Sequence, residues 1–225
     1  MTTGITQLQL RTSSGHRLAF TPTDVIVAGY TGRDTAAVAH HVDELAAIGV
    51  PRPDSIPAFY DVAAATVTTD ASIEVDGPST SGEVEPVLIY ANQRYYLTVG
   101  SDHTDRVLET QSIRLSKAAC PKPIAATVID LGTDPSIAHW DDITVCNRVN
   151  GELYQRGTLA SMLPLGELLS KWGKHARDES ALVLFGGTMP LVDGTFRYGR
   201  HWQMSLEVPG HAPIEFAYNV TVRSS

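Results

Sequence analysis

Three acidic residues near the middle of the chain have the types and spacing of ligands for a hard metal ion. Glu83 and Glu85 lie two residues apart at the start of an apolar stretch, and Asp102 ends the next one. In a β-strand, side chains two residues apart project from the same face, so the glutamates would lie side by side. Such carboxylates repel unless a positive charge lies between them, and their oxygens suit Mg²⁺, Mn²⁺ or Ca²⁺ better than zinc. An acidic, solvated strand edge has the same spacing, so both interpretations stay open at this stage.

A histidine and a glutamate share one face of a helix expected over residues 34–48. Asp34 can cap its first turn, and the alanines and leucine that follow favour a helical interior. His41 and Glu44 are three residues apart and His40 and Glu44 are four apart, so either pair consists of neighbours on the helix surface. A surface ion pair explains this spacing equally well.

The composition is that of an ordinary globular protein. The chain has 225 residues, of which 43% are hydrophobic and 19% charged, and we expect a single domain over residues 1–225. The net charge of -8 and the absence of basic runs argue against a nucleic-acid partner. Two cysteines form neither a disulfide framework nor a zinc motif. No apolar leader or membrane-spanning stretch is present, so we expect a cytoplasmic protein without a membrane partner.

Alternating apolar residues and turn signals predict a β-rich chain with two principal helices. Asn150-Gly151 is the strongest hairpin signal, and residues 70–82 are expected to form a turn-rich connection. The expected elements are an N-terminal hairpin (1–23), a strand at 25–28, a helix at 34–48, a hairpin of 85–91 and 94–100 turning at Asn92 and Gln93, a short helix within 106–117, strands at 124–131, 143–149 and 181–187, a helix at 163–172, and a hairpin of 201–208 and 214–222.

Several segments, in this order along the chain, resemble motifs of the fumarylacetoacetate hydrolase superfamily. They span about residues 24–222, and the resemblance is closer to its bacterial DUF2848 branch than to the well-studied members. The segments are VIVAGYTGRDTAAVAHHVDELA with its His-x-x-Glu helix, the Glu-x-Glu strand GEVEPVLIY, the Gly-x-Asp-x-Thr-x-Arg segment VGSDHTDR, Lys117 before a Cys-Pro stretch, the Asn-Gly-Glu hairpin and glutamine of VNGELYQRGTLASM, and the turn of LVLFGGTMPLVDG.

The resemblance implies a fold, a cofactor and a set of site residues. The fold would be α+β and β-rich, a single-domain mixed β-roll like the fumarylacetoacetase C-terminal-like fold, with residues 34–48 as a short lid helix. The cofactor would be Mg²⁺ or Mn²⁺, with Ca²⁺ as a substitute in vitro. The implied roles are metal ligation by Glu83, Glu85 and Asp102, catalysis by Lys117 and by a water-activating dyad of His41 and Glu44, and substrate binding by Arg106, Thr188 and Gln111.

The chain also departs from the family pattern at several positions. A plain hairpin joins Glu85 to Asp102, where relatives have a longer connection. Glu109 stands where the family often has a glutamine, with Gln111 close by, and His103 would have to point away from a metal bound at Asp102. These differences affect the expected substrate pocket rather than the expected metal ligands.

The resemblance implies a metal-dependent hydrolase of a small molecule with chelating oxygens. It would cleave a carbon–carbon bond of an acylpyruvate or β-diketone, or a carbon–nitrogen bond of an amide or enamide. One alternative is a metal-dependent lyase, isomerase or decarboxylase of 2-oxo acids, and another is a non-catalytic binding protein. The family further implies a homodimer.

Overall fold

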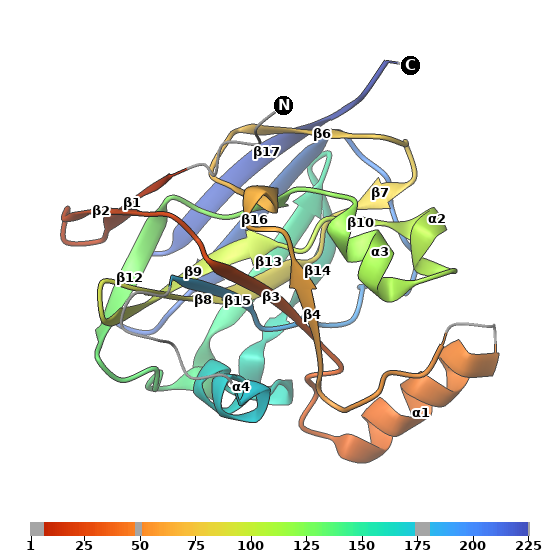
Figure 1. The fold of residues 1–225 in the computed structure, drawn as a ribbon, viewed down its shortest axis with the longest axis horizontal. Coiled ribbons are helices and arrows are strands. Elements are labelled where there is room, and N and C mark those ends of the chain that lie inside the picture. Colours follow the sequence, from red (N-terminus) through yellow and green to blue (C-terminus); the bar gives the residue numbers. More distant parts are fainter. Residues whose placement is uncertain (1–6, 48–50, 174–180, 225) are drawn as a thin grey trace.

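The computed structural model describes residues 7–47, 51–173 and 181–224, and its main feature is two β-sheets packed face to face. The larger sheet has eight strands in the order β2-β1-β12-β9-β8-β15-β3-β4 (Figure 1). Its strands are β1 (Leu8–Thr12), β2 (Arg17–Phe20), β3 (Asp24–Gly29), β4 (Ala58–Val62), β8 (Val84–Ala91), β9 (Arg94–Ser101), β12 (Thr127–Gly132) and β15 (Leu182–Phe185).

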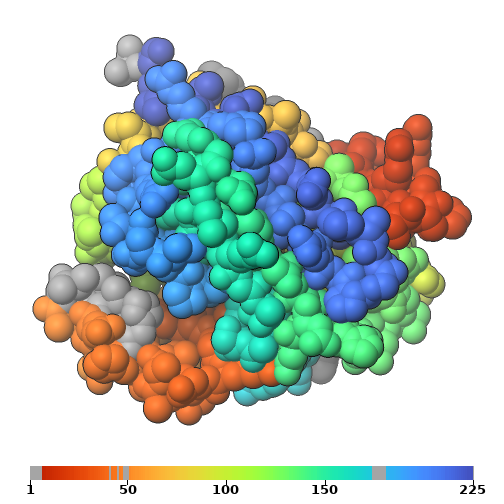
Figure 2. Space-filling model, turned by 180° about the vertical axis from the view of Figure 1, so that it is seen from behind, coloured from red at the N-terminus to blue at the C-terminus, as the bar shows by residue number. Residues whose placement is uncertain are grey.

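The smaller sheet has five strands in the order β14-β13-β16-β17-β6, and it spreads over one face of the molecule in Figure 2. Its strands are β6 (Ser72–Val75), β13 (Thr144–Val149), β14 (Glu152–Thr158), β16 (His201–Glu207) and β17 (Ile214–Val222). Two further ladders have two strands each: β7 (Thr80–Ser81) with β10 (Thr104–Asp105), and β5 (Val67–Thr68) with β11 (Lys122–Pro123).

The central strands of the larger sheet are buried on both faces, which explains their continuous apolar runs. Every residue of β8 and of β15 is buried. One face packs against the smaller sheet, so that Leu88 and Leu184 share a core with Trp202. The other face shares a second core with the apolar residues of the β1–β2 hairpin. The ends of β8 and β9 are therefore held on rigid strands.

The helices lie at the margins of the sheets. They are α1 (Thr35–Ala47), α2 (Arg106–Glu109), α3 (Ile113–Ala118) and α4 (Leu165–Trp172), with short 3₁₀ turns at Ala64–Thr66, Trp140–Asp142 and Leu159–Ser161. Helix α1 extends away from the sheets in Figure 1, and of its described side chains only Val42 is buried. Among the described residues, no helix is both long and apolar enough to cross a membrane.

The predicted β-rich α+β fold is confirmed, including the positions of most strands. Asn92 and Gln93 adopt positive φ angles of 51° and 60° between β8 and β9, and Asn150 and Gly151 turn between β13 and β14. Asp34 caps α1, since its carboxylate accepts hydrogen bonds from two backbone N–H groups at 3.0 Å. The last residues of the 34–48 prediction fall outside the described residues.

Two predictions about elements are wrong. Residues 70–82 contain β6, whose short alternating segment buries Ile73 and Val75 and pairs in parallel with β17. The single helix expected within 106–117 is two helices, because Asp105 caps α2 and Ser112 caps a separate α3.

The glycine before the Glu-x-Glu strand is required by close packing, which generates a stability prediction. A Cβ atom at Gly82 would lie 2.2 Å from Tyr218 Oη and 2.6 Å from Ser101 Oγ. Gly82→Ala must displace these buried groups and should lower the free energy of unfolding by about 2 kcal/mol. Gly77→Ala is the control, because a Cβ there meets nothing within 4 Å. Denaturant titrations measure both, and equal losses in the two variants would contradict the packing argument.

Candidate active site

The β8–β9 hairpin brings the three predicted ligand residues to one end of the larger sheet. Glu83 precedes β8, Glu85 lies within it, and Asp102 directly follows β9. The two-residue turn fixes the register, so Val84 pairs with Ser101, and the backbone N–H of Asp102 donates to the carbonyl of Glu83 at 3.0 Å. Glu83 and Asp102, which are 19 positions apart in the chain, thus become neighbours by strand pairing alone.

Asp102 is a fully buried carboxylate held between two lysines. Its Oδ2 accepts a hydrogen bond from Lys117 Nζ of α3, and its Oδ1 lies 3.2 Å from Lys122 Nζ of β11. Oδ1 nevertheless receives no well-aligned hydrogen bond. Burial would raise the pKa of Asp102, but the two ammonium groups lower it to about 2. Asp102 is therefore an anion at neutral pH.

Lys122 was not among the predicted site residues, although it is completely buried. Besides its contact with Asp102, its ammonium donates to the backbone carbonyls of His103 at 2.6 Å and Cys120 at 3.1 Å. Burial lowers the pKa of Lys122, while the charge of Asp102 opposes this. A lysine between two prolines carries no local signal of burial, so sequence reasoning could not have found it.

Glu85 is also buried, and a glycine turn satisfies one of its oxygens. Oε2 accepts a hydrogen bond from the backbone N–H of Gly187 at 2.8 Å. Gly187 has a φ of +87°, and a Cβ there would lie 2.1 Å from Thr31 Oγ1, so only glycine fits. Burial and the neighbouring Asp102 raise the pKa of Glu85 well above its usual value. A nearby cation is needed to keep all three carboxylates ionised.

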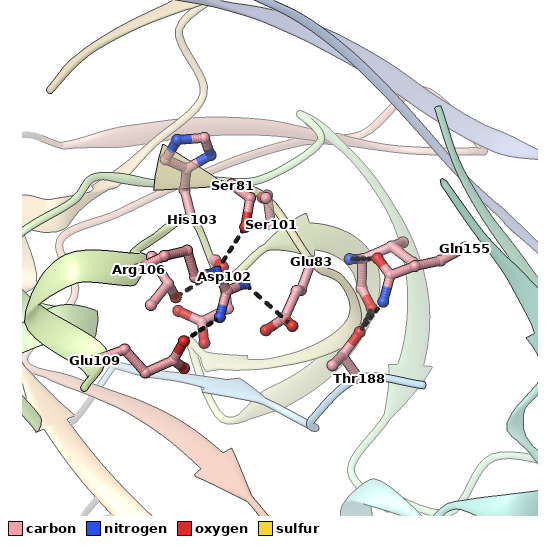
Figure 3. A network of polar contacts seen from close by, with 12 residues as sticks. Ser81, Glu83, Ser101, Asp102, His103, Arg106, Glu109, Gln155 and Thr188 are labelled. Atoms are coloured by element: carbon pink, nitrogen blue, oxygen red, sulfur yellow. Dashed lines mark hydrogen bonds and ion pairs between the residues drawn. The ribbon is translucent and has the colours of Figure 1, made fainter. Parts of the chain in front are cut away.

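Arg106 is buried beside Glu83 and forms an ion pair with it, although its Nη2 makes no aligned hydrogen bond (Figure 3). Nη2 lies 3.1 Å from Glu83 Oε1, Nη1 donates to Glu109 at 2.8 Å, and Nε donates to Ser81 Oγ at 2.6 Å. The ring of Phe196 covers its face, with 4.1 Å between the guanidinium carbon and the ring centroid. Burial raises the pKa of Glu83, and the charges of Arg106 and Lys117 lower it in part.

Thr188 and Gln155 hold the start of β8 in place through hydrogen bonds. Thr188 Oγ1 donates to the carbonyl of Val84 at 2.9 Å and accepts from Gln155 Nε2 at 2.8 Å. Gln155 Oε1 in turn accepts from the N–H of Val84 at 3.0 Å and from Asn147 Nδ2 at 2.9 Å. Gln155 is the glutamine after the Asn-Gly hairpin, and that motif was the signal that could have placed it at the site.

His103 points away from the carboxylates, on the opposite side of the chain from Asp102 (Figure 3). It lies between the sheets, where Nδ1 is 3.0 Å from Tyr218 Oη and Nε2 is 2.9 Å from Thr80 Oγ1. Burial, together with the positive charges of Lys122 and Arg106, lowers the pKa of His103 to about 3. This neutral imidazole supports the backbone behind the site.

The other predicted residues lie on α1 and on the connection between α2 and α3. On α1, His40 Nε2 lies 3.3 Å from Glu44 Oε1, and both side chains are exposed. The side chain of His41 lies outside the described residues, so its pairing with Glu44 stays a prediction. Gln111 is exposed between α2 and α3, and it is Glu109 that contacts Arg106.

The donor chemistry fits a hard divalent cation. Glu83, Glu85 and Asp102 all attract the ammonium of Lys117 and raise its pKa against the effect of burial. The carboxylates now face lysine and arginine, and within the described ranges no three acidic, histidine or cysteine side chains converge as a ready metal cluster. Oxygen ligands, a buried Asp102 Oδ1 without a hydrogen bond, and strong attraction for a cation are nevertheless the properties of a magnesium or manganese site.

A protein-family model with the description "Protein of unknown function (DUF2848)" matches residues 28–218. The chain belongs to the DUF2848 family. The match covers the carboxylate strand, both site lysines and the Gly-Gly-Thr turn, and it confirms the family predicted from the sequence motifs. No curated protein matches this DUF2848 sequence.

Solved structures share the fold of the DUF2848 protein at low sequence identity. A fumarylpyruvate hydrolase from Pseudomonas aeruginosa, in complex with Mn²⁺ and pyruvate, has a TM-score of 0.65 and 17% identity over 96% of this chain and 97% of its own. A 5-carboxymethyl-2-hydroxymuconate delta-isomerase from Mycobacterium smegmatis has a TM-score of 0.61 and 16% identity over 91% and 80%. A putative fumarylacetoacetate hydrolase family protein from Yersinia pestis has a TM-score of 0.63 and 17% identity over 95% of this chain and 100% of its own, so the chain has the predicted kind of fold.

The buried histidine generates a prediction about pH. The pKa of His103 is about 3 in the folded protein against an ordinary 6.5, so the unfolded chain takes up a proton first as the pH falls. Between pH 7 and pH 5 this removes about 2 kcal/mol of stability from the wild type. His103→Gln should be less stable than the wild type at pH 7 but should lack this pH-dependent loss. The difference in free energy of unfolding between the two proteins should therefore shrink by that amount between pH 7 and pH 5.

Urea titrations at both pH values measure the gap. The exposed His16→Gln is the matched control, since its imidazole meets solvent in both states, and it should follow the wild type. A gap of constant size between pH 7 and pH 5 would show that His103 is not held neutral.

Proposed function

We propose that this DUF2848 protein is a divalent-metal-dependent hydrolase of a small molecule with adjacent oxygen atoms. The observation that carries the proposal is the group of Glu83, Glu85 and Asp102 around the ammonium of Lys117. Buried acidic groups of this kind have no common structural purpose, and strongly shifted pKa values gather at functional sites. The Mn²⁺ and pyruvate in the structure of the Pseudomonas aeruginosa hydrolase support the same class of ligand.

The three carboxylates would hold Mg²⁺ or Mn²⁺, which when bound polarises a substrate carbonyl. Lys117 would then move from Asp102 towards the substrate, where its charge stabilises the negative charge that develops on the leaving group. Lys122 lets this happen, because it stays beside Asp102 and keeps that carboxylate ionised. Lys117 would thus act in catalysis, and Lys122 would keep Asp102 ionised.

Water activation would come from helix α1. His41 and Glu44, the predicted dyad, or the observed pair of His40 and Glu44 would take a proton from water and return it to the leaving group. Of the described α1 side chains only Val42 is buried, so little packing energy opposes a movement of the helix over the carboxylates. The bond cleaved would be carbon–carbon in an acylpyruvate or β-diketone, or carbon–nitrogen in an amide or enamide.

A second candidate is a metal-dependent isomerase, lyase or decarboxylase of 2-oxo acids. The observation that favours it is the Mycobacterium smegmatis isomerase, which has the same fold. Such reactions need the metal and the lysine but no activated water, so they should survive loss of the α1 histidines.

Removal of one carboxylate should abolish metal binding. Asp102→Asn and Glu83→Gln each delete a charged ligand, so the affinity for Mn²⁺ should fall by more than the roughly 10- to 100-fold that loss of an outer-shell partner costs. Isothermal titration with Mn²⁺ measures this. Glu74→Gln, at an exposed glutamate paired with Arg223, should bind like the wild type. A wild type that takes up no Mn²⁺, or variants that bind equally well, would refute the metal site.

Loss of the base should stop hydrolysis without loss of metal. His41→Ala should lower the rate of acylpyruvate cleavage by about 10²- to 10⁴-fold while Mn²⁺ affinity stays unchanged. His40→Ala is the matched control on the adjacent position, and a larger effect there would assign the base to His40. Unchanged rates in both variants, with decarboxylation of oxaloacetate retained, would favour the second candidate instead.

A further inference from the structure

The positively charged side chains around the three carboxylates, those of Arg106, Lys117 and Lys122, already bind groups of the protein. We propose that the pocket accepts substrates whose group distal to the chelating oxygens is uncharged, that it discriminates against a distal carboxylate, and that Glu109 determines this specificity. The inference rests on the proposed function, because it describes the substrate class of the same metal-dependent site.

Arg106 is the cation that would otherwise attract a substrate carboxylate. Its side chain is only 4% exposed, and its three nitrogens face Glu83, Ser81 and Glu109 at 2.6–3.1 Å. Phe196 covers one face of the guanidinium, and Nη2, which makes no aligned hydrogen bond, is itself buried beside Glu83, so a ligand cannot reach a bidentate pair of N–H groups. Arg106 is therefore a positioning residue for Glu83 rather than a ligand for substrate, which differs from the substrate-binding role that the family resemblance implies.

The two lysines likewise offer no available ammonium group to the distal end of a substrate. Lys122 is completely enclosed, and its ammonium contacts Asp102 and two backbone carbonyls. Lys117 binds Asp102 and faces the three candidate metal ligands, so its charge acts at the reacting end of a substrate. None of the three cations in the described site is thus left for a distal carboxylate.

Glu109 adds a negative charge beside this group. Its Oε2 binds Arg106, while its side chain stays 26% exposed. Tyr30 and Tyr60 lie within the electrostatic reach of both Lys117 and Glu109, and the Lys117 ammonium is 5.9 Å from the ring centroid of Tyr60. Burial raises the pKa of Tyr60 to about 12, so this phenol is neutral.

Two half-buried phenols and one partly exposed carboxylate thus lie around the buried cations. Neutral phenols contact amide, hydroxyl or hydrocarbon groups without a charge penalty. A substrate carboxylate placed beside Glu109 would meet a like charge in a partly desolvated setting, where repulsion costs far more than in water. The distal group favoured here is an amide, an alcohol or an alkyl chain.

A pair of six-carbon 2-oxo acids tests the inference directly. 2-Oxohexanoate and 2-oxoadipate carry the same chelating end and differ only in a distal methyl or carboxylate group. Titrated into Mn²⁺-loaded protein, 2-oxohexanoate should bind the wild type at least about tenfold more tightly. Glu109→Gln should reduce this ratio, and Glu167→Gln, at an exposed glutamate paired with Lys171, should leave it unchanged.

Added salt supplies a second measurement that needs no variant. Discrimination by charge should shrink as ionic strength rises, which keeps the inference testable if Glu109→Gln does not fold. Equal or tighter binding of 2-oxoadipate to the wild type, or binding of neither acid to protein that holds Mn²⁺, would overturn the specificity while leaving the metal site intact. Failure to take up Mn²⁺ at all would instead refute the proposed function, and the inference with it.

Discussion

The structure of the site depends on one constraint: the carboxylate of Asp102 is fully buried and must remain charged. An ionised group removed from water is stable only when opposite charges and hydrogen bonds replace its hydration. Lys117 and Lys122 do this from different elements, one from α3 and one from β11. The end of β9, the short helix and the ladder that follows it are consequently fixed relative to one another by a single anion. Breaking a buried pair of this kind typically costs about 3–5 kcal/mol, so the arrangement tolerates little change.

The same logic extends outward from Asp102. Glu85 is ionised only if the positive charge of Lys117 outweighs its burial and the repulsion from Asp102, and Glu83 depends in the same way on Arg106. Arg106 is stabilised in turn by Glu109 and by the ring of Phe196. Each charge therefore sets the protonation of the next, and the group responds as one unit to a change at any member.

Much of this arrangement could be predicted from local sequence signals. The turns at Asn92 and Asn150 and the cap at Asp34 each depend on a few neighbouring residues, and the Asn92 turn defines the β8–β9 hairpin that places Glu83 and Asp102 together. The parallel pairing of β6 with β17 could not be predicted, because its partner lies far away in the chain. The burial of Lys122 and the pairing of Arg106 with Glu83 and Glu109 could not be predicted either, because both depend on packing between elements. The role of His41 remains a prediction.

Strand β15 occupies the centre of the larger sheet although it comes late in the chain. It pairs in parallel with β3, from near the N-terminus, and antiparallel with β8, and the Gly187 N–H just beyond it satisfies Glu85. On the ribosome, β3 and β8 must therefore wait, with open edges, until Leu182–Phe185 has been synthesised. Such non-local pairing is slow to form, and exposed strand edges promote aggregation in the meantime. The strand order that makes the site rigid therefore also makes the nascent chain dependent on protection during synthesis.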